Sequence, residues 1–203
     1  MEPISLTGVR ILVSASSGLG LAMSEALLRA GASVALAARQ SSKLDSEVKR
    51  LVDVGYDAHK LPMDVRSEDS VSDAVTWVRE TWGSLDVLVN NAGIGMRTVN
   101  PRFMVEPLPF YEVTPDGFRD VIDTNLTYYF LVARGFAPMM VAQGHGKIIN
   151  ISMNHATMRR GVLSRMGRLV PGRSPCRTLW RKICCRTGLR SICCYRAVQR
   201  KPA

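Results

Sequence analysis

Short apolar runs alternate with helical patterns through residues 9–151, and this alternation constrains the fold more than any other feature. Apolar runs bounded by glycine, proline or serine predict buried strands, at residues 9–13, 33–37, 58–63, 85–89 and 147–151. Apolar residues spaced three and four apart predict helices at residues 21–29, 43–54 and 71–82, with one or two more within 115–141. Strands separated by helices form right-handed βαβ units. We therefore expect an α/β fold with a doubly wound parallel sheet covered on both faces.

The composition changes abruptly after Met158. Residues 159–203 carry 13 of the 27 lysines and arginines, none of the 17 acidic residues and all five cysteines. We therefore expect one folded domain over residues 1–158, followed by a basic, cysteine-rich tail over 159–203. The net charge of +10 comes from the tail. It is therefore not taken as a sign of nucleic-acid binding, and we expect no nucleic-acid partner.

The domain itself has the character of a cytoplasmic protein. It lacks any run approaching the ~20 apolar residues of a membrane span, so we expect no membrane partner. Its first residues carry Glu2 and lead straight into a strand, unlike a secretory signal. A cysteine-free domain suits a reducing compartment, and we expect no bound metal.

A glycine-containing loop joins the first expected strand to the first expected helix. Glycines at this point let the backbone approach a pyrophosphate, and the helix N-terminus offers free N–H groups to its oxygens. A plain structural turn is the alternative. The position of the loop between a strand and a helix favours phosphate binding. The candidate residues are Ser14, Ser16, Ser17, Gly18, Leu19 and Gly20.

Five segments within residues 7–158 together resemble the short-chain dehydrogenase/reductase family. The loop matches the last two glycines of the family motif TGxxxGxG, with Val13 and Ser14 where Thr and the first Gly are usual. Residues 90–93 read NNAG, the most specific match. The other three segments are Met63-Asp64-Val65, Asp123-Thr124-Asn125-Leu126 and Asn150-Ile151-Ser152. The resemblance implies that residues 1–158 form a Rossmann-type dinucleotide-binding domain.

The resemblance also implies roles for individual residues. Asp64 and Val65 correspond to the adenine-contacting segment of the family, and Asn91, Ala92 and Gly93 to its cofactor-binding turn. Asn125 corresponds to the catalytic asparagine that holds a water molecule. The reaction implied is hydride transfer between a nicotinamide and a small-molecule carbonyl or alcohol substrate.

The residues after the second strand bear on the choice of cofactor. An acid there would bind the adenosine ribose diol and select NAD, but this chain has Ala38 followed by Arg39. A guanidinium can pair with a 2′-phosphate. We therefore expect NADP rather than NAD, the alternative being that Arg39 is a solvated surface charge.

The expected catalytic residues are largely missing. The family uses a Ser, then a Tyr 13 residues later and a Lys four beyond it, whereas this chain has Met153, Met166 and Val170. A phenol needs a nearby cation and a positioned donor to act near neutral pH. His155 could act as an acid or base by residue type, although a surface role is the alternative. We expect an oxidoreductase by lineage that is inactive in this chain; the alternative is a non-catalytic NADP(H)-binding or partner-binding protein with a basic tail.

The tail can be tested against the genetic code. Read one base out of frame with suitable synonymous codons, residues 160–174 can encode RGFVPYGPSRAGAE and residues 187–203 can encode WVAVNMLLPGGATETG. Both resemble family segments in the right order. We hypothesise a one-base frame change near residues 159–161. The alternatives are that the tail forms a zinc site or a nucleic-acid-binding arm. The spacing of the cysteines argues against the zinc site.

A frame change would remove the last strands of the sheet. We expect the sheet to be incomplete at its C-terminal edge, with the strand at 147–151 left bare, and the tail to be poorly ordered. Oligomerisation is possible, but part of the family interface would be missing.

Overall fold

The computed structural model describes residues 5–103, 105–106 and 108–153 together with the backbone of residues 190–196. Its sheet has six parallel strands in the order β3-β2-β1-β4-β5-β6. The strands are β1 (Arg10–Ser14), β2 (Ser33–Ala38), β3 (Ala58–Pro62), β4 (Val87–Asn90), β5 (Lys147–Met153) and β6 (Arg190–Arg196). The strand order reverses direction between β1 and β4, which is where a doubly wound sheet binds its ligand.

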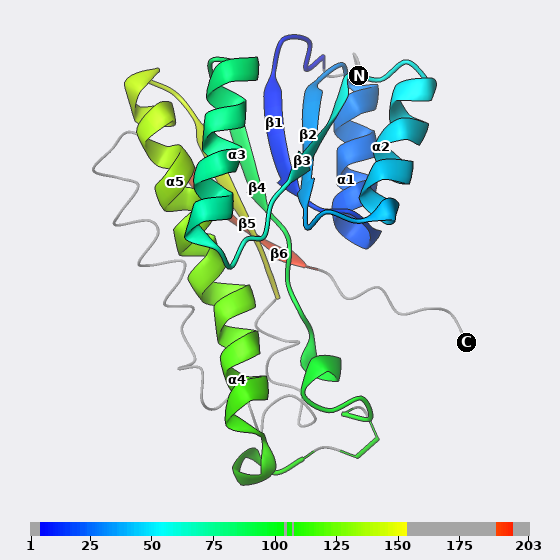
Figure 1. Cartoon of the computed structure of the whole chain (residues 1–203), viewed down its shortest axis with the longest axis vertical. Helices are drawn as coiled ribbons and strands as arrows, with labels where there is room; N and C mark the ends of the chain where they lie inside the picture. The colour runs from blue at the N-terminus through cyan, green and yellow to red at the C-terminus, as the bar shows by residue number, and fades with distance from the viewer. Residues whose placement is uncertain (1–4, 104, 107, 154–189, 197–203) are drawn as a thin grey trace.

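Helices cover both faces of this sheet (Figure 1). They are α1 (Gly18–Arg29), α2 (Ser42–Asp53), α3 (Glu68–Thr81), α4 (Pro115–Ile122) and α5 (Tyr128–Ala142), with a π-helical turn (Asp123–Thr127) joining the last two and short 3-10 helices at Met96–Thr98 and Phe110–Glu112. Within the described residues, no helix combines the length and the apolar character needed to cross a membrane.

Alternation along the strands divides the buried residues into two cores. In β1, Leu12 belongs to the core under α3 and α5, whereas Val13 belongs to the core under α1 and α2. The α3–α5 core also includes the fully buried Tyr128 and Phe136. A strand with apolar residues on both faces is the expected sequence of a parallel sheet covered on both sides.

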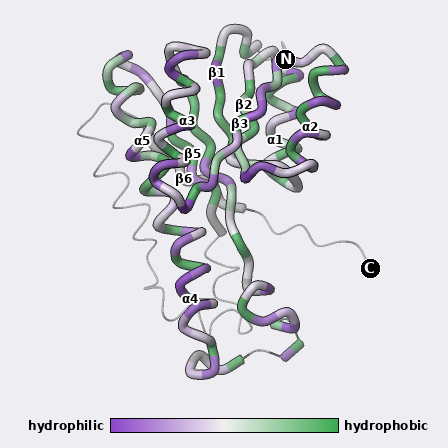
Figure 2. Tube along the Cα trace, viewed as in Figure 1, coloured by the Kyte–Doolittle hydropathy of each residue, from purple (hydrophilic) through white to green (hydrophobic). Residues whose placement is uncertain are grey.

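Helix α4 differs from the others because none of its residues is buried. It extends beyond the carboxyl ends of the strands, and hydrophilic and hydrophobic residues alternate along it (Figure 2). Thr114 caps it by accepting the Gly117 N–H at 3.1 Å, and Pro115 occupies the first turn, where no N–H partner is needed.

The five strands expected from the sequence are all present, but the expectation of a bare fifth strand is wrong. β6 pairs with β5 in parallel, from Lys147 opposite Arg190 to Met153 opposite Arg196. An unpaired edge presents free N–H and C=O groups that favour addition of a strand, and the sequence SICCYR contains the β-branched and aromatic residues that strands favour. The rest of the tail lies outside the described residues, so the frame change and the order of the tail stay predictions.

Candidate dinucleotide-binding site

Ser14 is the central hydrogen-bonding residue at the carboxyl ends of the strands. It is fully buried at the end of β1. Its Oγ accepts the backbone N–H groups of Asn91 at 2.8 Å and Ala92 at 2.9 Å. The same oxygen lies 3.1 Å from the Tyr128 hydroxyl and 3.3 Å from the Val89 carbonyl oxygen. The structure therefore places Ser14 beneath the turn at residues 90–94, called the NNAG turn below. There it fixes the turn to β1.

The rest of the glycine loop lies at the surface. Ser17, Gly18 and Leu19 are exposed, and Ser16 is half-buried. Gly18 has φ +58°, a conformation that favours glycine. Ser17 is the N-cap residue of α1, yet its side chain makes no capping hydrogen bond. The first N–H groups of this helix therefore lack a side-chain cap and suit an anion.

Gly20 permits close contact between α1 and the NNAG turn. A Cβ at this position would collide with Ala15 Cβ and Asn91 Nδ2. Asn91 in turn donates from Nδ2 to the Ser14 carbonyl oxygen at 3.2 Å. The glycine loop and the turn are thus packed directly against each other.

Asn125 holds the far end of the same turn. Its Nδ2 donates to the Ile94 carbonyl oxygen at 2.8 Å, and its Oδ1 accepts the Ile94 N–H at 2.9 Å. Asn125 lies in the π-helical turn, a feature frequent at functional sites. A Cβ on Gly93 would lie 2.9 Å from Asn125 Oδ1, so the glycine allows this approach. Both halves of the Asn125 amide are thus engaged by the protein itself.

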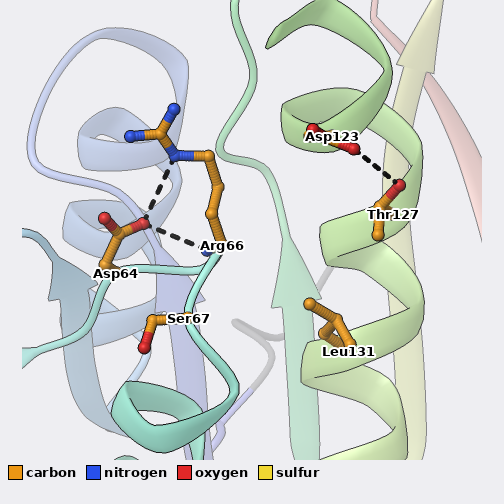
Figure 3. A pocket seen from close by; sticks show the side chains of 6 residues that line it. All are labelled: Asp64, Arg66, Ser67, Asp123, Thr127 and Leu131. Atoms are coloured by element: carbon orange, nitrogen blue, oxygen red, sulfur yellow. Dashed lines mark hydrogen bonds and ion pairs between the residues drawn. The ribbon is translucent and has the colours of Figure 1, made fainter. Parts of the chain in front are cut away.

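A pocket of about 450 Å³ lies beside Asp64, between the β3–α3 connection and the helix that carries Asn125. Figure 3 shows its lining residues in two groups that face each other. They are Asp64, Arg66 and Ser67 on the connection, and Asp123, Thr127 and Leu131 on the helix. The Asp64 carboxylate accepts the Arg66 N–H at 3.0 Å. The neighbouring Val65 is 9% exposed. The predicted adenine-contacting segment therefore borders a polar pocket.

Arg39 directly follows β2. Its side chain is exposed and makes no hydrogen bond or ion pair with any residue that the structure describes. The guanidinium is therefore available to an anion at the carboxyl edge of the sheet.

Two buried polar pairs at the carboxyl edge of the sheet were not predicted from the sequence. One is Tyr128 with Ser14. The other is Asn90 with Asn150, directly opposite on β4 and β5, where Asn90 Nδ2 donates to Asn150 Oδ1 at 2.9 Å. Asn90 Oδ1 and Asn150 Nδ2 have no partner among the described residues. An asparagine at the end of β4 and another in the middle of β5 were the available signal for this second pair.

The predicted catalytic positions are only partly described. Met153 is the last residue of β5. The positions of Met166, Val170 and His155 lie outside the described residues, as do the side chains of the tail. Within the part of the chain that the structure covers, no three His, Cys, Asp or Glu side chains are grouped to hold a metal ion.

A parallel sheet with a glycine loop, an uncapped helix and a second turn at its reversal point defines a Rossmann-type fold. The chain belongs to the short chain dehydrogenase family, whose sequence profile matches residues 9–165.

Similar proteins include several that act on sugar acids. Gluconate 5-dehydrogenase of Gluconobacter oxydans is 34% identical over 157 residues, which are 77% of this chain and 57% of that protein. The 5-keto-D-gluconate 5-reductase of Escherichia coli K12 is 30% identical over 161 residues, covering 79% and 59% of the two chains. The chain thus spans less than two thirds of the length of these relatives.

Solved structures show the same fold. A gluconate 5-dehydrogenase from Burkholderia cenocepacia in complex with NADP and tartrate superposes with a TM-score of 0.77 at 28% identity, covering 95% of this chain and 72% of that chain. A metagenomic short-chain oxidoreductase in complex with NADP gives a TM-score of 0.78 at 28% identity, with coverage of 93% and 81%.

Proposed function

We propose that this chain binds NADP(H) and descends from oxidoreductases that interconvert a carbonyl and an alcohol. The observation that carries the proposal is the unpaired Arg39 at the end of β2, on the same edge of the sheet as the uncapped N-terminus of α1. Two similar solved structures are NADP complexes, which supports this cofactor over NAD.

The residues present fit such a dinucleotide. The N–H groups at the start of α1 would hold the pyrophosphate. Gly18 leaves open space beside them, and Gly20 allows α1 to pack against Asn91. Asp64 would contact the adenine amino group, and Arg39 would pair with the 2′-phosphate. The remaining members of the proposed binding set are Ser14, Ser16, Ser17, Leu19, Val65, Asn91, Ala92 and Gly93. When bound, the cofactor supplies a transferable hydride at the nicotinamide ring.

The substrate class that we propose is a small sugar acid or its keto form. Gluconate 5-dehydrogenase and 5-keto-D-gluconate 5-reductase are among the relatives, which supports a polyhydroxy acid substrate. We also propose a cytoplasmic location, since the domain lacks cysteine.

Catalysis is expected to be absent or very slow. Reduction of a carbonyl needs a proton donor within hydrogen-bond reach of the substrate oxygen, and methionine and valine at 153, 166 and 170 cannot supply one. Tyr128 does not replace the missing phenol: it is fully buried and burial raises its pKa, so it keeps its proton.

A non-catalytic NADP(H)-binding protein is therefore the second candidate. Two observations favour it. The glycine loop and the NNAG turn pack closely together. The catalytic positions, in contrast, are occupied by Met153, Met166 and Val170.

Titration of the purified full chain with NADPH and NADH, followed by NADPH oxidation with 5-keto-gluconate, tests the proposal. NADPH binding tighter than NADH binding, without turnover, is the expected result. Turnover would contradict the inactivity, and failure to bind either nucleotide would overturn the proposed function. Sequencing of genomic DNA and of transcripts separately tests the frame change; an intact frame through residues 159–203 would refute it.

A further inference from the structure

Tyr128 is a buried tyrosine whose hydroxyl lies at the carboxyl ends of the strands. It is the first residue of α5, directly after the π-helical turn, and its side chain is fully buried. Its ring packs edge-on against Tyr129, with centroids 4.6 Å apart. A buried tyrosine hydroxyl ordinarily requires a hydrogen-bond partner. The hydrogen-bond partner of the Tyr128 hydroxyl, Ser14, lies at the proposed nucleotide site.

The hydrogen bond with Ser14 connects Tyr128 to the NNAG turn. The Tyr128 hydroxyl lies 3.1 Å from Ser14 Oγ, the atom that accepts the N–H groups of Asn91 and Ala92. Removal of the Tyr128 hydroxyl would leave a gap beside Ser14 Oγ and free that oxygen to shift.

The same helical segment holds the other end of the turn through Asn125. That residue pairs with both backbone polar atoms of Ile94. Residues 91–94 are thus attached at one end to Asn125 and at the other to Tyr128 and Ser14. Backbone groups held in this way need little reordering when a ligand arrives.

We infer that Tyr128 is a positioning residue for nucleotide binding, which fixes the NNAG turn through Ser14 before the cofactor binds. The inference rests on the proposed NADP(H) binding. Tyr128 contacts no substrate and moves no proton; it acts through the backbone of Asn91 and Ala92. Phenylalanine at this position fills the same volume but cannot make this hydrogen bond.

The test compares Tyr128→Phe with Tyr129→Phe in the full-length chain. Tyr129 is the control, because it is adjacent and largely buried, and its hydroxyl donates to the Ile151 carbonyl on β5. Both variants lose one buried hydroxyl. We expect Tyr128→Phe to weaken NADPH binding about three- to tenfold, and Tyr129→Phe to change it less than about twofold, when both are measured at a temperature where they are fully folded.

Amide hydrogen exchange of the nucleotide-free protein measures how firmly the NNAG turn is held. In Tyr128→Phe, exchange of the Asn91 and Ala92 amides should accelerate, while amides in β3 remain unchanged. Ser14→Thr, which keeps the hydroxyl, should retain protection and NADPH affinity better than Ser14→Ala. Equal NADPH affinity in the two tyrosine variants, together with unchanged exchange at residues 91–94, would overturn the inference. If the parent chain binds no NADPH but Tyr128→Phe still accelerates this exchange, the proposed function fails while the positioning contact stands.

Discussion

The Asn125 side chain forms a closed pair of hydrogen bonds with the backbone of Ile94, donating to its carbonyl oxygen at 2.8 Å and accepting its N–H at 2.9 Å. This pairing suits an amide, which offers one donor and one acceptor side by side, whereas an ionised carboxylate offers acceptors alone. The identity of the residue at 125 is therefore explained by the shape of the turn, whatever chemistry the turn supports.

Asn125→Asp should accordingly destabilise the protein. An ionised carboxylate has nearly the same shape but places a second acceptor against the Ile94 carbonyl oxygen. We expect the free energy of unfolding to fall by about 1–3 kcal/mol, as measured by urea denaturation. Asn100→Asp is the control, since Asn100 pairs with backbone groups in an exposed loop. Equal losses in the two variants would contradict a special role for the Ile94 contact.

Gly20→Ala and Gly18→Ala separate two reasons for glycine in the loop. A Cβ at Gly20 collides with Ala15 and Asn91, whereas a Cβ at Gly18 meets no atom within 4 Å and suffers only from φ +58°. We expect Gly18→Ala to cost about 1 kcal/mol of stability and Gly20→Ala to cost more and to weaken NADPH binding. Thermal unfolding and NADPH titration measure both effects. A smaller stability loss in Gly20→Ala than in Gly18→Ala would show that the turn can move aside.

The sequence predicted the strands well because each is an apolar run ended by turn residues. It singled out the glycine loop by its place between a strand and a helix, and Asn91 by the resemblance to the family. It did not predict the role of Ser14, whose hydroxyl lies beneath the turn because Ser14 is still a strand residue with its side chain on the α5 face. Nor does any residue pattern mark the π-helical turn or the partner of the Tyr128 hydroxyl. Such contacts depend on how α5 crosses the strand ends, which local sequence does not encode. β6 was missed for a different reason: the basic composition around residues 190–196 masked a short strand.

Arg39→Ala should lower the affinity for NADPH much more than that for NADH. Loss of a charge-assisted contact to the 2′-phosphate predicts a decrease of about 10- to 100-fold in NADPH affinity, with NADH nearly unaffected. Fluorescence titration with each nucleotide measures the ratio. Arg79→Ala, at the last turn of α3, removes an exposed arginine elsewhere and should change neither affinity. A parallel loss for both nucleotides would mean that Arg39 acts on something other than the 2′-phosphate.

Asp57 provides a pH-dependent contribution to stability far from the site. Its carboxylate accepts the Ser33 hydroxyl and pairs with His59 Nε2 at 2.7 Å, and these contacts, Ser33 first, lower the pKa of Asp57 below its usual 3.8. Since the folded state favours the ionised form, this stabilisation is present above about pH 4 and is lost as the pH falls through the lowered folded-state pKa. The side chain is 61% exposed, so solvent screening keeps the effect small.

Asp57→Asn should therefore make the loss of stability below about pH 4 shallower. The measurement is the urea midpoint of the variant and of the parent chain across this acid range. Asp73→Asn removes the same charge from a carboxylate on α3 that makes no hydrogen bond or ion pair with any described residue, and its pH profile should follow the parent. If Asp57→Asn also followed the parent profile, the Ser33 and His59 contacts would not persist in solution. Those contacts are what lower the pKa of Asp57 in the folded state.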